Sequence, residues 1–217
     1  MAQPTVSFPV ALPVSLLQRP PPFSPALLEP PLPAFAVSTA LVAVAEIGDK
    51  TQLLSFALAA HYRKPGVIIL GILIATLANH ALAGSLGVLL AHWLTARTTA
   101  LLVGCGFIAF GVWALFPDRL DSAPKTHGGV FITTLIVFFI AEMGDKTQLA
   151  TIGLGARFAL PLAVIGGTTL GMMIANVPAV LIGHRLADKL PLRAMRWTAA
   201  ALFFVTGALS LWLVPPG

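Results

Sequence analysis

The sequence predicts an all-α integral membrane protein, with six transmembrane helices arranged as two inverted three-helix repeats. Of its 217 residues, 57% are hydrophobic and only 10% are charged, whereas a soluble domain has about 25% charged residues. The apolar residues gather in six segments long enough to cross a bilayer. A nine-residue motif with charged side chains occurs twice, in the first and the fourth of these segments. Together these observations give the fold class and the repeat.

Charge and cysteine content exclude several classes of function. The net charge is +5, but basic residues in the loops of a membrane protein set its orientation. We therefore expect the lipid bilayer as a partner and no nucleic acid. Cys105 is the only cysteine, so neither an internal disulfide nor a cysteine-based metal cluster can form.

Residues 1–33 form a separate N-terminal segment that holds more than half of the 18 prolines. Proline removes a backbone donor and breaks a continuous helix. A secretory signal needs an uninterrupted apolar stretch, which this segment lacks. We therefore expect a flexible proline-rich tail.

Six transmembrane segments follow from about Phe35 onward. They are predicted at residues 35–60, 66–91, 98–116, 130–155, 160–184 and 195–214. The loops after the first, third and fifth segments hold eight lysines and arginines, and the other side holds three. Because positive loops stay in the cytoplasm, both termini are expected on the outer side, which is the periplasm in a bacterium.

The repeat divides the chain into residues 34–116 and 130–217, joined by a cytoplasmic loop at 117–129. Ala-Glu-Ile-Gly-Asp-Lys-Thr-Gln-Leu at 45–53 recurs as Ala-Glu-Met-Gly-Asp-Lys-Thr-Gln-Leu at 141–149. Each half has three segments, and this odd number predicts that the second half enters the membrane from the opposite side. Inverted repeats of this kind are typical of secondary transporters, whose site lies at the repeat interface.

Four carboxylates in the motifs are the candidate site: Glu46, Asp49, Glu142 and Asp145. Charged groups inside a bilayer are costly, so they pair, line a cavity or bind a ligand. A purely structural alternative is that each glutamate pairs with the lysine four residues later. That alternative leaves both aspartates and the duplication unexplained.

The motif geometry favours a cation site. Glu and Asp at i and i+3 share one helical face, and the glycine between them lets the backbone unwind. Oxygen ligands of this kind suit Ca²⁺, Mg²⁺ and Mn²⁺. Neighbouring residues are expected to support the site with neutral oxygens, backbone freedom or positive charge. They are Gly48, Lys50, Thr51, Gln52, Asn79, Gly144, Lys146, Thr147, Gln148 and Asn176.

His80 and the two motif lysines each allow two interpretations. His80 lies beside the predicted site, where an imidazole would favour a transition metal, but a histidine that faces the lumen or forms an interhelical hydrogen bond is the plainer interpretation. The two lysines, Lys50 and Lys146, either balance the charge of the site or extend to the membrane interface.

Charge balance indicates an exchange mechanism. Four carboxylates and two lysines sum to −2, which one divalent cation neutralises. Without the cation, protons are expected on these carboxylates, because burial and mutual repulsion disfavour their charged form. Metal and protons would then compete for the same oxygens. The sequence contains no Walker motif, so proton coupling is the expected energy source for export against the membrane potential.

The duplicated Glu-x-Gly-Asp-Lys-Thr motif resembles that of the small divalent-cation/proton exchangers. This family includes Golgi and thylakoid calcium/manganese transporters and bacterial manganese exporters, within the calcium/cation antiporter superfamily. The resemblance covers about residues 35–214. It implies that the four motif carboxylates bind the cation and exchange protons, and that the protein exports Mn²⁺, with Ca²⁺ as the alternative. It also implies no permanently bound cofactor and, because the central loop is short, a bacterial inner-membrane location.

Other classes of function remain as alternatives. A small amino-acid exporter would need a larger cavity with a helix end that binds a carboxylate. An uncoupled cation channel or a structural assembly factor would not need proton exchange. An intramembrane aspartyl protease would need a Tyr-Asp motif, but the only tyrosine, Tyr62, precedes Arg63. The sequence therefore predicts a transporter rather than an enzyme.

Overall fold

The computed structural model describes residues 31–116, 128–182 and 192–214, and all regular structure in these ranges is helical. The predicted all-α class is therefore confirmed. The described helices are α1 (Pro31–Glu46), α2 (Lys50–Tyr62), α3 (Pro65–Trp93), α4 (Ala96–Ala114), α5 (Val130–Glu142), α6 (Lys146–Phe158), α7 (Pro161–Ile182) and α8 (Leu192–Trp212).

Helix α1 begins at Pro31, inside the segment predicted as a tail. A helix can begin at a proline, because proline in a first turn lacks only a donor that would have no intrahelical partner. The rest of the predicted tail, residues 1–30, lies outside the described residues.

The first and fourth predicted segments are each broken into two helices. α1 ends at Glu46 and α2 starts at Lys50, with a bend of 68° between them. α5 ends at Glu142 and α6 starts at Lys146 in the same way. Gly48 and Gly144 have φ angles of 82° and 74°, a left-handed conformation that is accessible to glycine but ends an α-helix. The segments predicted at 35–60 and 130–155 are thus each interrupted at the glycine where the sequence indicated that the backbone can unwind.

Three described helices, α3, α4 and α7, are long and apolar enough to cross a membrane, and the bent pair α1–α2 makes a fourth candidate span. α5 is apolar but has only 13 residues, fewer than the about 20 that a crossing needs.

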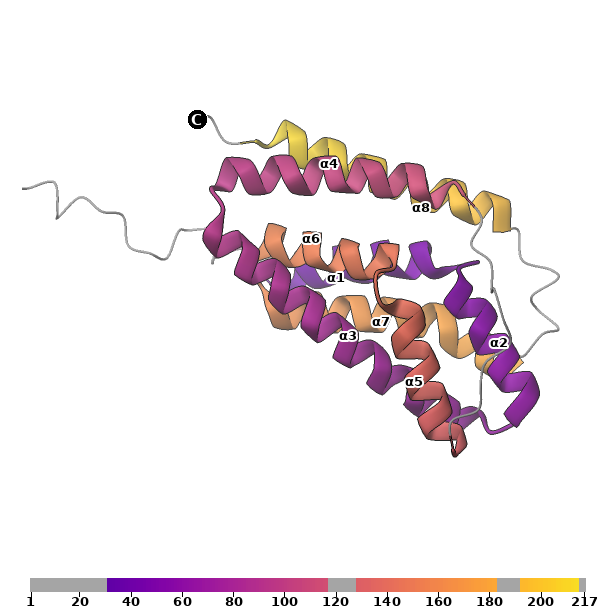
Figure 1. Ribbon diagram of the computed structural model, residues 1–217. Coiled ribbons are helices and arrows are strands. Elements are labelled where there is room, and N and C mark those ends of the chain that lie inside the picture. The colour runs from indigo at the N-terminus through magenta and orange to yellow at the C-terminus, as the bar shows by residue number, and fades with distance from the viewer. Residues whose placement is uncertain (1–30, 117–127, 183–191, 215–217) are drawn as a thin grey trace, which may run out of the picture.

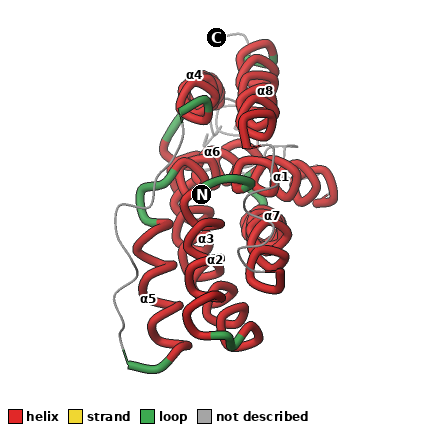
Figure 2. The backbone as a smooth tube through the Cα atoms, turned by 90° about the vertical axis from the view of Figure 1, so that its right-hand side faces the viewer, coloured by secondary structure: helices red, strands yellow, loops and turns green. Residues whose placement is uncertain are grey.

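The helices pack around the two breaks. α4 and α8 run side by side, above α1 and α6 in Figure 1, and the same pair stands over the remaining helices in Figure 2. α1 packs against α7, and α3 packs against both α5 and α6. One hydrophobic cluster gathers around Phe107 and Phe203 of α4 and α8. A second gathers around Phe138 and Met172 of α5 and α7. α1 contributes to both clusters, so its broken end is held in the interior.

Candidate functional site

Both motifs end one helix and begin another through the same local contacts. Asp49 and Asp145 are the residues that precede the first turns of α2 and α6. The Gly48 backbone N–H donates to Gln52 Oε1 at 2.8 Å, and Gly144 N–H donates to Gln148 at 2.7 Å. The glutamine reaches back over the helix start, as in a capping box. Each aspartate therefore lies at the positive end of a helix dipole, which stabilises its negative charge.

The four carboxylates are buried, each with at most 2% of its surface exposed. Thr51 donates to Glu46 Oε2 at 2.5 Å, and Thr147 donates to Glu142 Oε2 at 3.2 Å. The other oxygen of each glutamate, Oε1, has no hydrogen-bond partner within the described ranges. Buried polar atoms are nearly always paired, so these two oxygens are available to a cation or a proton.

The lysines pair across the two halves of the chain. Lys50 Nζ lies 2.8 Å from Asp145 Oδ1, and Lys146 forms an ion pair with Asp49. In the described part of the chain, neither lysine forms an ion pair with the glutamate of its own motif, as the structural alternative would require. The cross pairing ties the two breaks into one charged centre.

Three carboxylates come close enough to share one metal ion. Glu46, Asp49 and Asp145 each offer an oxygen, and these atoms all lie within 4.8 Å of one another. Ligand oxygens lie 2.3–2.6 Å from a calcium ion and therefore at most about 5 Å apart. The trio, as we call these three residues, combines both motifs. Glu142 is buried nearby on its own motif but is outside the trio.

The predicted amide residues connect the breaks to neighbouring helices. Gln148 Nε2 donates to Asn79 Oδ1 at 2.7 Å, and Asn79 Nδ2 donates to the Phe139 carbonyl at 2.9 Å. In the other half, Gln52 Nε2 donates to the Ala175 carbonyl at 3.0 Å. These contacts fix the breaks to α3 and α7.

Ser55 is a site residue that the sequence analysis missed. Its hydroxyl donates to Asn176 Oδ1 at 2.7 Å, which joins α2 to α7. Its place three residues after Gln52, on the same face of a helix, was the available signal.

His80 does not have the interhelical hydrogen bond that the plainer interpretation predicts. It is fully buried, and among the described residues neither ring nitrogen has a partner. It is not in the trio either.

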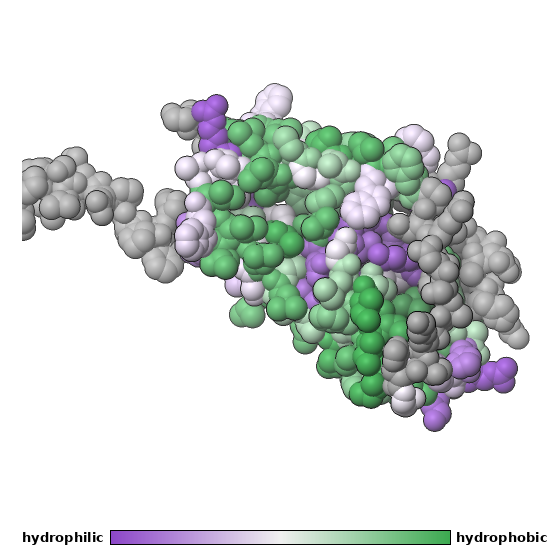
Figure 3. Space-filling model, viewed as in Figure 1, coloured by the Kyte–Doolittle hydropathy of each residue, from purple (hydrophilic) through white to green (hydrophobic). Residues whose placement is uncertain are grey.

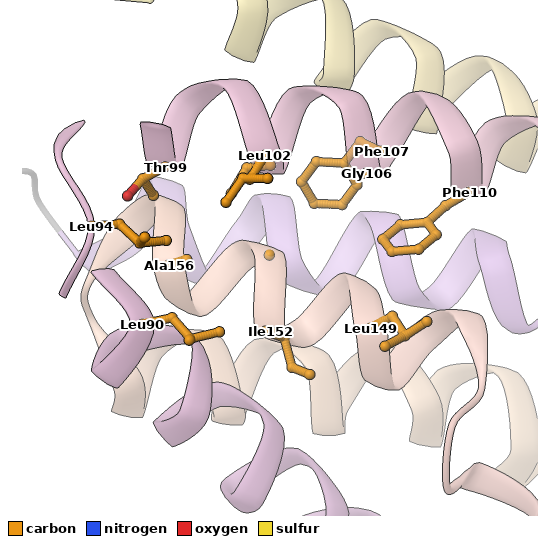
Figure 4. A pocket seen from close by; sticks show the side chains of 12 residues that line it. Leu90, Leu94, Thr99, Leu102, Gly106, Phe107, Phe110, Leu149, Ile152 and Ala156 are labelled. Atoms are coloured by element: carbon orange, nitrogen blue, oxygen red, sulfur yellow. The ribbon is translucent and has the colours of Figure 1, made fainter. Parts of the chain in front are cut away.

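A separate cavity of about 220 Å³ lies between α3, α4 and α6. Figure 4 shows that its lining is hydrocarbon apart from the Thr99 hydroxyl. None of its lining residues carries a charged side chain that could bind the charged groups of an amino acid.

A buried charged centre in an apolar helical molecule defines an integral membrane protein of the ion-transporter class. The sequence profile of a family described as "Divalent cation/proton antiporter GDT1" matches residues 34–122 and again residues 130–214. The chain therefore belongs to the GDT1 family of divalent cation/proton antiporters. It is a transporter and not an enzyme, and the second match confirms an internal repeat.

Named relatives agree with this family. A Vibrio cholerae protein named "Putative manganese exporter" is 50% identical over 184 residues, covering 84% of this chain and 92% of the relative. GDT1-like protein 5 of Arabidopsis thaliana is 27% identical over 220 residues, covering 83% and 96%. A GDT1-like protein of Synechocystis is 27% identical over 207 residues, covering 83% and 98%. No solved structure matches the chain.

Proposed function

We propose that the protein exports Mn²⁺ from the cytoplasm in exchange for protons, by alternating access to one central site. Glu46, Asp49, Glu142 and Asp145 are the residues that bind the cation and the protons. Ca²⁺ is the second candidate substrate. The observation that carries the proposal is the trio, since it brings carboxylates of both motifs within the reach of a single ion.

The broken helices support binding and release at this site. The carboxyl-terminal ends of α1 and α5 carry the partial negative charge of the helix dipole, which favours a cation. Discontinuous helices at a repeat interface are a recurring construction in secondary transporters. The glycines at the breaks allow the backbone to change conformation there.

Proton exchange follows from the chemistry of the same oxygens. A carboxylate that binds a proton is a poor cation ligand, so the metal ion and the protons do not occupy the same carboxylates at the same time. The Oε1 atoms of Glu46 and Glu142, which have no hydrogen-bond partner among the described residues, can bind either the metal ion or a proton. If the protein changes conformation only when it carries either the metal ion or protons, each change moves one of them across the membrane. The metal ion and the protons are then transported in opposite directions.

The proposed topology has six membrane crossings, with α1–α2 and α5–α6 each forming one broken crossing. An odd number of crossings in each half makes the repeats inverted. The distribution of lysine and arginine supports a topology with both termini in the periplasm of a bacterial inner membrane. Under this topology the repeats are residues 34–116 and 130–217, and the loop at 117–129 is cytoplasmic.

The metal preference rests on ligand chemistry and on one relative. Carboxylate oxygens suit both Mn²⁺ and Ca²⁺. The 50% identical relative has a name that states manganese export, which favours Mn²⁺.

The test is transport by the purified full chain in liposomes that contain a pH dye and a Mn²⁺-sensitive dye. External Mn²⁺ should enter while protons leave the lumen. Both fluxes should be lost in Glu46→Gln and in Glu142→Gln. Glu29→Gln is the matched control, because it makes the same change at the only glutamate outside the motifs. Mn²⁺ entry without proton movement would contradict the proposal in favour of a channel.

A further inference from the structure

The two motif lysines occupy equivalent sequence positions but different surroundings. Lys50 and Lys146 each bind the aspartate of the opposite motif. The Lys50 side chain is 28% exposed, whereas that of Lys146 is 5% exposed. Because the motif is the same, the difference comes from the packing around each copy.

Helices α4 and α8 cover the side on which Lys146 lies. Phe116, which follows α4, and Arg196, near the start of α8, line a cleft that also touches Asp49 and Lys146. This cleft has a volume of about 10 Å³, which is room for about one water molecule. The space that this cleft leaves beside Lys146 is therefore no larger than about one water molecule.

The side on which Lys50 lies is open. Met143 is 58% exposed, and the glycine that follows it is also exposed. Figure 3 shows hydrophilic atoms in the middle of an apolar face, near the junction of α5 and α6 in Figure 1. The Lys50 ammonium group therefore has an open side toward which it can leave its aspartate.

A divalent cation in the trio would meet the Lys50 ammonium at the same carboxylate. Asp145 belongs to the trio, and its Oδ1 lies 2.8 Å from Lys50 Nζ. Two positive charges on one carboxylate in a low-dielectric interior repel each other strongly.

We infer that Lys50 is a tethered competitor of the transported cation: it occupies Asp145 from the open side and leaves when a divalent cation binds, while Lys146 remains on Asp49. This inference rests on the proposed function. A tethered group has a high effective concentration at its site. Lys50 therefore weakens cation binding and promotes release of the cation.

The test measures the reactivity of the two lysines in the full chain. The purified wild-type protein is acylated with an amine-reactive ester, with Mn²⁺ or with NaCl at equal ionic strength, and labelling is quantified by mass spectrometry. Loss of the free Mn²⁺ signal in electron paramagnetic resonance reports binding in the same samples. Mn²⁺ should raise the labelling of Lys50 by about fivefold or more, a usual size for coupling between sites, and leave that of Lys146 unchanged.

The outcomes separate this inference from the proposed function. If Mn²⁺ binds and Lys50 labelling stays the same or falls, the inference is overturned and the proposed function stands. If Mn²⁺ does not bind to the folded wild-type protein, the proposed function fails and the inference fails with it.

A transport measurement adds a readout that a structural role would not produce. Lys50→Met removes the competitor, so the KM for Mn²⁺ should fall by about fivefold or more while kcat also falls because release becomes slower. Lys50→Arg keeps the positive charge and should restore a high KM. A higher KM in Lys50→Met would contradict the inference.

Discussion

The side-chain amide of Gln148 donates a 2.7 Å hydrogen bond to Asn79 Oδ1, which links the second motif to helix α3 of the first half. The same glutamine accepts from the Gly144 backbone. One side chain therefore fixes both the helix break and its position against the other repeat.

The first prediction concerns Asn79. In Asn79→Ala, the Gln148 amide loses its acceptor and the Phe139 carbonyl keeps only the Met143 backbone donor. A buried group left without its partner costs about 1–3 kcal/mol, so the thermal unfolding temperature in detergent should fall. Thr198→Ala is the control, because this threonine is exposed and bonds only within its own helix. Equal unfolding temperatures for both variants would show that the Asn79 contacts do not hold the break.

The second prediction concerns the backbone at Gly144. Its φ is 74°, and an added Cβ would meet no atom within 4 Å. Gly144→Ala therefore tests the left-handed backbone conformation without adding a steric clash. The substitution should destabilise the folded protein by about 1–2 kcal/mol and should also lower the transport rate. Gly129→Ala is matched, since its Cβ would also meet nothing and its φ is −76°. Gly144→Asn should recover part of the loss, because asparagine tolerates the left-handed region better than alanine.

The third prediction separates the trio from Glu142. Glu46→Gln should abolish Mn²⁺ binding measured by electron paramagnetic resonance, because it removes a ligand charge from the trio. Glu142→Gln should weaken Mn²⁺ binding less than Glu46→Gln does but should still lose transport, because Glu142 lies outside the trio and also takes part in the exchange with protons. Loss of binding in both variants would show that all four carboxylates hold the ion together.

The fourth prediction is the pH dependence of Mn²⁺ binding. Protons and Mn²⁺ compete for the same carboxylate oxygens, so lowering the pH should weaken binding and raising it should strengthen binding. One linked proton changes the apparent affinity by at most about tenfold per pH unit. Titrations at several pH values, each read by the free Mn²⁺ signal, measure the slope. An affinity that is independent of pH would contradict proton competition.

The sequence predicted the helical class and the repeat because both depend on composition and on the identity of the motif. It also indicated Glu46, Asp49 and Asp145, since carboxylates in apolar segments need a function. Apolar content alone could not show that the first and fourth segments break. The break depends on the backbone conformation of Gly48 and Gly144, which tertiary packing selects.

The pairing within the site was beyond prediction for a different reason. Residue spacing on one helix favours contact between Glu46 and Lys50, yet Lys50 lies on Asp145 of the other half. Contacts between halves depend on how the repeats pack, which the spacing within one motif does not encode. The exposure that distinguishes Lys50 from Lys146 has the same origin.

The central claim is that the site couples Mn²⁺ movement to protons, and uphill transport tests it most directly. Liposomes with an acidic lumen are placed in a more alkaline buffer that contains Mn²⁺, and the free Mn²⁺ concentration inside is followed. Protons that leave down their gradient should drive Mn²⁺ inside to a concentration above that outside, and nigericin, which collapses the pH gradient, should abolish this accumulation. Internal Mn²⁺ that only reaches the external concentration while the gradient persists would contradict the exchange mechanism.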